Sequence, residues 1–498
     1  MKDKLKLIPF LFLIFVTLWL RLVNLGYSDY QGDEIRAMWR PAPNQGMLEY
    51  LYAQSKGPTQ FLVSYLIKWI DPNYANQWLL RLPFSLVGIL AILFFYYLVY
   101  IHFGKKIAIY AALFLSTNGV FVGLMRIAQY QPYVILFSIF TLLAFSLAIQ
   151  QERWKITGIH LGIFFWAAAV FTHYDGVFIA PYALYLIYIW YRQNTDLPRS
   201  ARLTILAIPA AVSALALAAY YGPFWLSASS GTTSYWMERI IGDEEVTLLP
   251  SSIFTFKLYN PLLGLYIYWA LGIFSLIRFR RIFPILLWFL FPWVFMEMVI
   301  YDPGTHIYTY LIPGTILVAF GVQVVEEILT KIMGAKWSRV ANIAWIATMF
   351  MALAAISHLI FVDHTPEYPF EQRRILFWTM GGPDETYHQW VFGFPYYRRW
   401  EDIREFITSD ESNSFYASNE KNSLTSFYIP YTVGLTKAGY YIYIRNPQSF
   451  RARDLRAKVR YWREHYAPIK VFEVEGRVVT EIYKMPPGSL KEIKAAGY

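Results

Sequence analysis

Two adjacent acidic residues, Asp33 and Glu34, lie in the stretch GDEIRAMWR, a few residues after the first long apolar run, and Arg36 follows them. A carboxylate can take a proton from a hydroxyl as a general base, and hard divalent cations prefer oxygen ligands. An acid pair at the mouth of a helical bundle is therefore a candidate catalytic or cation site. The alternative is an ordinary solvated loop that carries charge.

Further polar groups are expected at helix ends on the same side of a membrane. Lys56 opens a KGPT turn, and Arg126 is followed by Gln129, Tyr130 and Gln131 just before another apolar run. Ionisable side chains are costly to place in lipid and usually face the protein interior or a water-filled cavity. This grouping favours an aqueous or substrate-lined cavity.

Two histidines interrupt the apolar pattern on that same side. His173 and Asp175 stand between the predicted fifth and sixth spans, and His306 precedes a later span. A single histidine at a helix turn more often caps the helix or lies at the membrane interface than takes part in chemistry. Both interpretations stay open for these two residues.

Membrane-spanning helices must position these residues. Hydrophobic residues make up 56% of the 498-residue chain and charged residues 16%, which is more apolar surface than a soluble core of this length could bury. Apolar stretches of about 16 to 23 residues recur from Leu7 to Val362, and roughly 20 residues suffice to cross the hydrocarbon of a bilayer. The composition therefore indicates a multi-spanning integral membrane protein.

We predict about eleven transmembrane helices. They are Leu7–Leu25, Leu79–Ile101, Ile107–Met125, Tyr133–Ile149, Ile156–Phe171, Val177–Tyr191, Leu203–Tyr221, Leu258–Ile277, Ile282–Ile300, Ile307–Val325 and Ile343–Val362. Lys and Arg cluster in alternate short loops, so the net charge of +10 is a topology signal and predicts no nucleic-acid partner. The positive-inside rule predicts a cytoplasmic N-terminus and an extracytoplasmic acid pair. We expect a multi-pass protein of the plasma (inner) membrane. The absence of cysteine excludes disulfides, thiolate metal sites and cysteine nucleophiles.

The chain divides into two predicted domains. Residues 1–362 form an all-α polytopic membrane domain, and the polar residues 363–498 suffice for one soluble extracytoplasmic α/β domain. Its patterns predict a helix at residues 400–408, a strand at 440–444, and a hairpin of 471–474 with 478–483 across Glu475-Gly476.

The outer loop after the first span has structure of its own. Residues 47–55 and 59–69 have the apolar spacing of helices, and Pro58 stands at the start of the second. We predict outer amphipathic helices at about residues 47–69, lying on the membrane face next to the acid pair.

The order of these features resembles a known family. Asp33, Glu34 and Arg36 match a D-E-x-R pattern, KGPTQFLVSYL stands where the family has K-P-P-L before an amphipathic helix, and Arg81-Leu82-Pro83 starts the second span. FGKKIAIYAALFLSTNGVFVGLMRIAQYQPYVILF resembles the family's third and fourth spans. The chain is similar to the polyprenyl-phosphate-sugar-dependent membrane glycosyltransferases of GT-C fold, the protein O-mannosyltransferase and aminoarabinose transferase type. The similarity covers the first 190 residues well and is thin beyond them.

The resemblance implies an inverting transfer of a hexose or pentose from a polyprenyl-phosphate sugar donor to an acceptor hydroxyl on a protein, a lipid or a glycan of the cell envelope. Asp33 would be the general base, and Glu34 would orient the base or the acceptor. Cations would stabilise the charge that grows on the leaving lipid phosphate. The candidates are Lys56 and Arg126, then Arg36 and His306, with His173, Asp175, Gln131 and Tyr130 as further donor or acceptor contacts.

One departure from the family concerns metal binding. Members of the aminoarabinose branch often have Asp-Pro at the start of the fourth span, whereas this chain has Gln131-Pro132 and so lacks that second carboxylate. The sequence identifies no definite cofactor and leaves the metal requirement open. A divalent cation could replace one of the protein cations, bound by Asp33, Glu34 and Asp175.

A polytopic transporter or lipid flippase is the competing hypothesis. Transport would predict charges or broken helices near the midplane of several spans. The polar residues instead gather at one face, which favours chemistry at the outer face.

Overall fold

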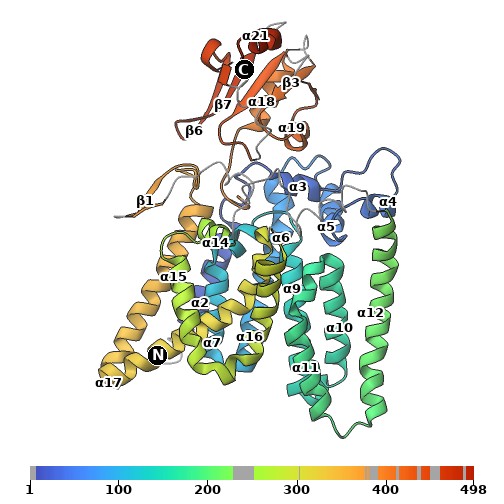
Figure 1. Cartoon of the computed structure of the whole chain (residues 1–498), viewed down its shortest axis with the longest axis vertical. Coiled ribbons are helices and arrows are strands. Elements are labelled where there is room, and N and C mark those ends of the chain that lie inside the picture. The colour runs from blue at the N-terminus through green and yellow to red at the C-terminus, as the bar shows by residue number, and fades with distance from the viewer. Residues whose placement is uncertain are drawn as a thin grey trace.

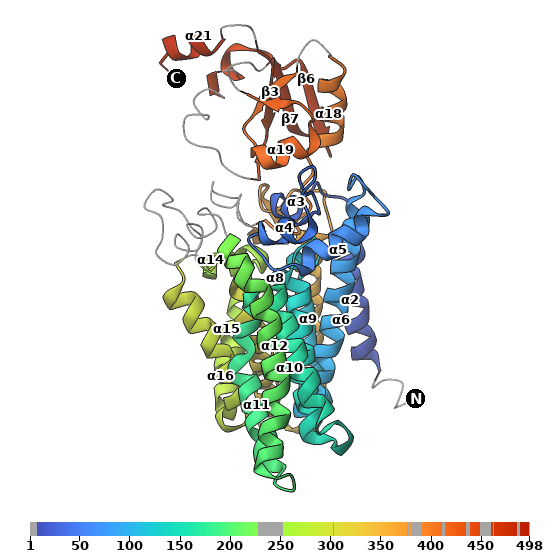
Figure 2. The ribbon, with the colours of Figure 1, turned by 90° about the vertical axis from the view of Figure 1, so that its right-hand side faces the viewer.

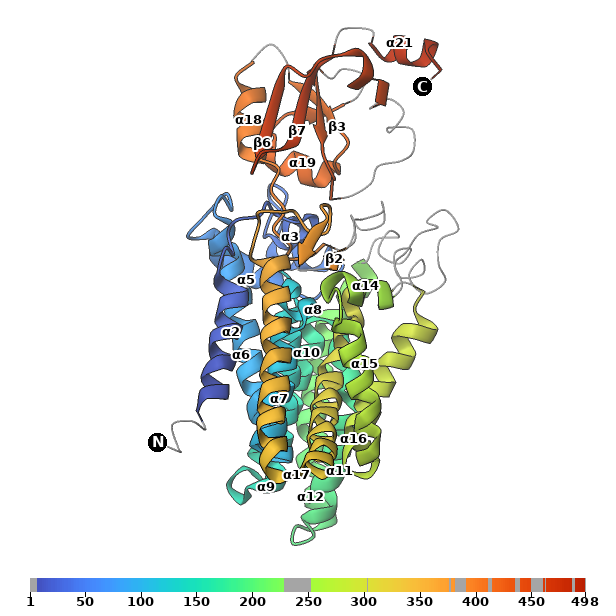
Figure 3. The same ribbon diagram turned by 90° about the vertical axis from the view of Figure 1, so that its left-hand side faces the viewer.

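The computed structural model describes residues 7–227, 252–301, 303–375, 378–380, 391–410, 414–434, 439–448, 460–461, 463–485 and 489–497. In these ranges the chain forms a bundle of long helices, short helices at one end of the bundle, and a C-terminal domain with a β-sheet beyond them (Figure 1). The N-terminal end of α2 (Ile8–Leu22) lies toward the opposite end of the bundle from this domain (Figure 2, Figure 3).

Apolar helices of bilayer length build the bundle. The described segments long and apolar enough to cross a membrane are Gln77–Phe103, Gln131–Gln150, Arg199–Ser227, Gly264–Val299 and Gly304–Phe361. After α2, the helices of the bundle in chain order are α6 (Gln77–Phe103), α7 (Lys105–Thr117), α8 (Gly119–Leu124), α9 (Gln131–Gln150), α10 (Thr157–Thr172), α11 (Ala180–Gln193), α12 (Arg199–Ser227), α14 (Ser252–Tyr259), α15 (Gly264–Ser275), α16 (Phe279–Val294) and α17 (Tyr308–Phe361). The chain is a polytopic membrane protein, and the number of eleven spans stays a prediction.

Two predicted spans are broken by a pair of asparagines. The predicted span Ile107–Met125 is divided at Asn118 into α7 and α8. The predicted span Leu258–Ile277 begins too early, because α14 ends at Tyr259 and α15 begins only at Gly264. The N–H of Gly119 donates to Asn260 Oδ1 at 2.8 Å, and Asn260 Nδ2 donates to Asn118 Oδ1 at 3.2 Å. Each break therefore supplies hydrogen-bond partners to the other inside an apolar surrounding.

The last two predicted spans, Ile307–Val325 and Ile343–Val362, are the two arms of α17. The chain reverses at Gly334, whose φ of 74° lies in the left-handed region that favours glycine. Asn342 Nδ2 donates to the carbonyl of Glu326 at 3.4 Å across this reversal, which places the two arms side by side.

Three short helices lie between the bundle and the C-terminal domain (Figure 1). They are α3 (Gly32–Ala37), α4 (Met47–Tyr52) and α5 (Thr59–Lys68). The last two lie within the range 47–69 where the sequence pattern predicts helices, and they end slightly earlier than the pattern indicates.

The C-terminal domain contains a five-stranded sheet of order β4-β3-β5-β7-β6 and a separate two-stranded ribbon of β1 and β2. Its elements are β1 (Arg373–Ile375), β2 (Trp378–Met380), α18 (Trp400–Thr408), β3 (Phe415–Ser418), α19 (Asn422–Tyr428), β4 (Thr432–Val433), β5 (Tyr440–Ile444), β6 (Lys470–Val474), β7 (Arg477–Lys484) and α21 (Ser489–Ala495). The predicted hairpin is confirmed, because Glu475 and Gly476 have φ of 50° and 74° and join β6 to β7 in a two-residue turn.

The C-terminal domain packs directly on the loop that carries the acid pair. Tyr428 and Trp400 of this domain share an apolar core with Tyr30. The N–H of Tyr30 donates to the Tyr428 hydroxyl at 2.8 Å. Gln448 accepts from the N–H of Gly32 at 3.0 Å and donates to the Tyr30 carbonyl at 3.1 Å. The acid loop is therefore held by the far end of the chain.

Candidate active site

Glu34 lies in a fully buried ion pair. Arg81 Nε and Nη2 donate to its two carboxylate oxygens, each at 2.8 Å. The backbone N–H groups of Ala128 and Gln31 add bonds at 3.0 Å and 2.9 Å. The Glu34 and Arg81 side chains are 0% and 1% exposed. With both oxygens bonded in this way, Glu34 holds α3 in place and can orient a neighbouring base rather than a substrate.

Asp33 occupies a different environment on the same helix. Its side chain is 34% exposed, with Lys56 Nζ 3.7 Å from one carboxylate oxygen and Arg36 Nη1 3.9 Å from the other. Burial alone would raise the pKa of Asp33, but Lys56 and then Arg36 hold the pKa below its ordinary value of 3.8. Asp33 is therefore an ionised, reachable carboxylate at neutral pH.

Lys56 is positioned by a close approach of its turn to the end of α10. A Cβ on Gly57 would lie 2.1 Å from the Phe171 carbonyl oxygen, so this position accepts no larger residue without a backbone shift. The hydroxyls of Thr59 and Thr172 are 2.8 Å apart and join the same two segments. The sequence KGPT thus fixes the ammonium group near Asp33.

Arg126 is turned toward the end of the first helix. Its guanidinium donates to the carbonyls of Leu20 at 2.8 Å, Val23 at 2.9 Å and Asn24 at 3.2 Å, and the residue is 5% exposed. Burial lowers the pKa of Arg126 to about 9. The structure thus gives this cation a bonded role at the C-terminus of α2, where orphan carbonyls need donors.

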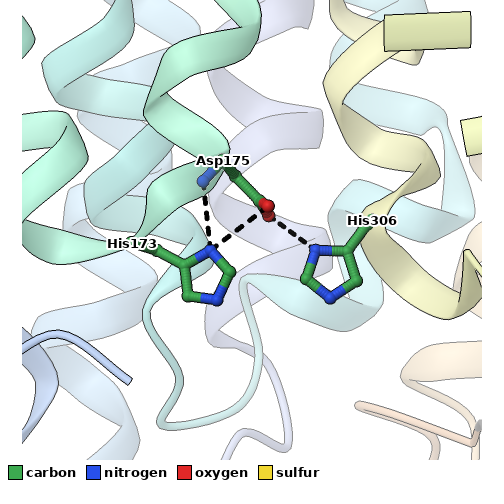
Figure 4. Close-up of side chains that lie close together, drawn as sticks. All are labelled: His173, Asp175 and His306. Carbon is green, nitrogen blue, oxygen red and sulfur yellow. Dashed lines mark hydrogen bonds and ion pairs between the residues drawn. The ribbon is translucent and has the colours of Figure 1, made fainter. Parts of the chain in front are cut away.

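His173, Asp175 and His306 form one compact cluster (Figure 4). His173 and Asp175 lie at the start of η2 (Tyr174–Ile179), and His306 lies in η5 (Gly304–Ile307). Asp175 Oδ1 is 3.2 Å from His173 Nδ1, and Asp175 Oδ2 is 2.7 Å from His306 Nδ1. Burial lowers the pKa of His173 to about 4, so its ring is neutral at pH 7.

Tyr130 connects this cluster to the acid helix. Its ring stacks on His173 with centroids 3.9 Å apart, and Lys56 Nζ lies 5.1 Å from the centre of the same ring. Asp33, Lys56, Tyr130 and the histidine cluster therefore form one continuous run of contacts. Gln131 is buried at the start of α9, beside Tyr130 in the chain.

Sequence reasoning missed several residues of this site. Arg81 was seen as part of a motif, but its pairing with Glu34 depends on how α6 packs. Tyr308, whose hydroxyl donates to Asp175 Oδ2 at 2.8 Å, and Gln448 lie far along the chain and carry no local signal. The three-carboxylate cation site of Asp33, Glu34 and Asp175 is not assembled, because Glu34 is bonded to Arg81.

A known protein family matches part of the helical bundle. Residues 61–221 match the family described as dolichyl-phosphate-mannose-protein mannosyltransferase. No curated protein matches the chain in sequence.

Solved structures similar to the chain include proteins from two organisms. Archaeal oligosaccharyltransferase AglB from Archaeoglobus fulgidus, in complex with an inhibitory peptide and a dolichol-phosphate, has 12% identity and a TM-score of 0.51, covering 89% of this chain and 70% of AglB. The oligosaccharyltransferase of the same organism tethered with an acceptor peptide has 12% identity and a TM-score of 0.48, covering 87% of this chain and 64% of that one. ArnT from Cupriavidus metallidurans bound to undecaprenyl phosphate has 12% identity and a TM-score of 0.46, covering 95% and 96%.

The fold and the family match agree with the resemblance seen in the sequence. The likeness to AglB shows the fold, and the matched residues include α6 and the helices around Tyr130 and His173. Together they confirm the predicted resemblance to polyprenyl-phosphate-dependent membrane glycosyltransferases of the GT-C class. The chain spans about two thirds of the length of the archaeal oligosaccharyltransferases it resembles.

Proposed function

We propose that the chain is an inverting glycosyltransferase that moves a sugar from a polyprenyl-phosphate donor to an acceptor hydroxyl at the outer face of the plasma (inner) membrane. The observation that carries this proposal is Asp33, an ionised and partly exposed carboxylate beside Lys56 and Arg36. The family match supports transfer over the transport alternative. AglB has been solved with a lipid phosphate bound, and a lipid phosphate is the leaving group that we propose here.

Asp33 is the proposed general base. The acceptor oxygen attacks the anomeric carbon, the bond from that carbon to the phosphate oxygen breaks, and the hydroxyl proton passes to Asp33. A pKa below 3.8 makes Asp33 a weak base in the free protein. A donor phosphate that draws Lys56 and Arg36 toward itself would remove two cations from the carboxylate and raise its pKa. A single displacement inverts the anomeric configuration.

Lys56 is the best-placed partner for the leaving phosphate. It lies 3.7 Å from Asp33 with 22% of its side chain exposed, and Arg36 is next to the same carboxylate. Arg126 is the less favoured candidate of the two predicted first, because its guanidinium is bonded to three backbone carbonyls. A fixed cation at the departing oxygen stabilises the charge that develops there.

The C-terminal domain, residues 363–498, is proposed to cover the site and receive the acceptor, while residues 1–362 bind the donor. Support comes from Lys421, at the start of α19, whose charge acts on Asp33. Gln448 and Tyr428 fasten the same domain to the acid loop. The acceptor is a protein, a lipid or a glycan.

The test is transfer of radiolabelled sugar from a panel of polyprenyl-phosphate monosaccharides in native membranes. Asp33→Asn is compared with the unaltered chain at equal abundance, and Glu49→Gln serves as a matched acid-to-amide control because Glu49 is exposed on α4. We expect transfer to be lost in Asp33→Asn and kept in Glu49→Gln. Transfer that is indifferent to Asp33, or a product of retained configuration, would contradict the mechanism.

The proposed orientation has its own test. The N-terminus is cytoplasmic and the site extracytoplasmic in this proposal, as the loop charges indicate. A reporter fused after Val362 should be active outside the cytoplasm, and a cytoplasmic signal would overturn the assignment of the active face.

A further inference from the structure

Asp175 is a completely buried acid between two histidines from loops that are 131 residues apart (Figure 4). We propose that His173, Asp175 and His306 bind one divalent transition-metal ion of the zinc type. This site is separate from Asp33 and goes beyond the proposed sugar transfer.

The spacing of the three side chains suits a metal. Ligand atoms about 2.0–2.1 Å from a tetrahedral zinc ion lie roughly 3.3 Å from one another. The two histidine nitrogens are 3.2 Å and 2.7 Å from the Asp175 oxygens, and all candidate ligand atoms lie within 4.8 Å of one another. A small movement of the side chains would therefore complete the coordination.

The hydrogen bonding at Asp175 leaves a place for a cation. Its backbone N–H donates to His173 Nδ1 at 3.2 Å, which requires an unprotonated nitrogen at that position. Asp175 Oδ1, 3.2 Å from the same nitrogen, accepts no hydrogen bond from the described residues. Asp175 Oδ1 is thus a buried carboxylate oxygen without a donor, which is unfavourable. A metal ion bound to this oxygen and to His173 Nδ1, in place of the long backbone N–H bond, would supply the missing partner.

The donor set selects the metal. Two imidazole nitrogens and one carboxylate oxygen are the ligands that zinc and related transition ions prefer, whereas calcium and magnesium take oxygen. Tyr308 donates to Asp175 Oδ2 at 2.8 Å and would orient the carboxylate from outside the coordination sphere. Three protein ligands leave one position open.

The ion would join η2 to η5 and fix the ring of His173. Tyr130 stacks on that ring and lies under the Lys56 ammonium. A bound metal would therefore also restrict the movement of the Tyr130 ring that contacts Lys56.

Metal binding to the full-length chain in detergent micelles tests the proposal. After removal of metal with a chelator, the protein is titrated with Co²⁺ and with Zn²⁺, and stoichiometry is measured by equilibrium dialysis. We expect one ion per chain, visible cobalt bands of a four- or five-coordinate nitrogen and oxygen site, and displacement of Co²⁺ by Zn²⁺.

A graded series of variants locates the ion. Asp175→Asn and His306→Gln should weaken binding at least about 100-fold, and Tyr308→Phe about 10-fold as an outer-shell change. His160→Gln, an exposed histidine on α10, should leave binding unchanged. No stoichiometric binding to the unaltered chain, or binding that ignores Asp175 and His306, would overturn the proposal.

The cobalt spectrum of the unaltered chain tests histidine ligation even if a variant does not fold. Weak octahedral bands from all-oxygen coordination in the unaltered chain would refute histidine ligation. None of these measurements uses sugar transfer, so a failed metal site and a failed transferase mechanism are distinguishable.

Discussion

Replacing Glu34 with glutamine should damage the fold far more than replacing its neighbour Asp33 with asparagine. Glu34 is 0% exposed and accepts two bonds from Arg81 at 2.8 Å and two from backbone N–H groups. An amide keeps one acceptor oxygen and turns the other position into a donor that faces donors. It also leaves the buried guanidinium of Arg81 without its counter-charge.

The expected magnitude follows from that loss. Removing one partner of a buried ion pair costs about 3–5 kcal/mol, so Glu34→Gln should lower the free energy of unfolding by that amount. Asp33 has partly exposed partners at 3.7 Å and 3.9 Å, and such pairs contribute about 0–1 kcal/mol. Asp33→Asn should therefore abolish transfer at nearly unchanged stability.

Unfolding of the purified chain in mixed micelles, with refolding checked, measures both variants. A double-mutant cycle with Arg81→Gln should give a coupling of about 1–3 kcal/mol between Arg81 and Glu34. A Glu34→Gln protein that is as stable as the unaltered chain but inactive would refute the structural role and place Glu34 in the reaction itself.

Three further results are expected. Gly57→Ala should lower transfer at least about tenfold and lower the free energy of unfolding by about 1–3 kcal/mol, because the new Cβ would lie 2.1 Å from a carbonyl oxygen. Gly46→Ala, where a Cβ would meet open space, should change neither transfer nor unfolding. Transfer at limiting donor, measured as kcat/KM from pH 8 to pH 5, should show no acidic decline due to Asp33, because kcat/KM reports the free protein, in which the pKa of Asp33 lies below 3.8. Lys56→Gln should move the decline to higher pH. An Asp33-dependent decline of kcat/KM near pH 6 in the unaltered chain would contradict this. Burial raises the pKa of Asp29 to about 7, so the folded state binds this proton more tightly than the unfolded state does. The free energy of unfolding should therefore fall by at most about 4 kcal/mol as pH rises from about 4 to 7. In Asp29→Asn, the free energy of unfolding should depend less on pH over this range.

The sequence led to different predicted roles for Asp33 and Glu34, but it did not show which contacts separate them. Asp33 and Glu34 are adjacent and chemically alike, and the D-E-x-R pattern treats them together. Their roles separate because Arg81, on α6, reaches one of them and Lys56 reaches the other. That outcome depends on how helices pack, which no local pattern contains.

The histidine cluster shows the same limit over a longer distance. Taken alone, His173 and His306 each left two interpretations open, a capping or interfacial residue and a residue of the site. Asp175 and His306 are 131 residues apart and come within 2.7 Å. Sequence spacing can identify metal ligands that share one helix or loop. It cannot identify ligands on two loops that meet only because the helices of a bundle pack together.

Apolar length predicted most bundle helices, since hydrophobic stretches must match the bilayer. It failed at Asn118 and Asn260, where two short polar residues in apolar runs end helices by bonding to each other. Each residue alone looks tolerable in a span. Together the two asparagines stabilise helix ends that neither residue alone would predict.

The acid helix is fixed from two sides, and this arrangement determines which acid can meet a substrate. From the bundle, Arg81 bonds to Glu34 and to the carbonyls of Leu25, Ser28 and Asp29. From the C-terminal domain, Gln448 bonds to the loop at Gly32. With Glu34 fully buried by these contacts and Asp33 still 34% exposed, a substrate reaching α3 meets the carboxylate of Asp33.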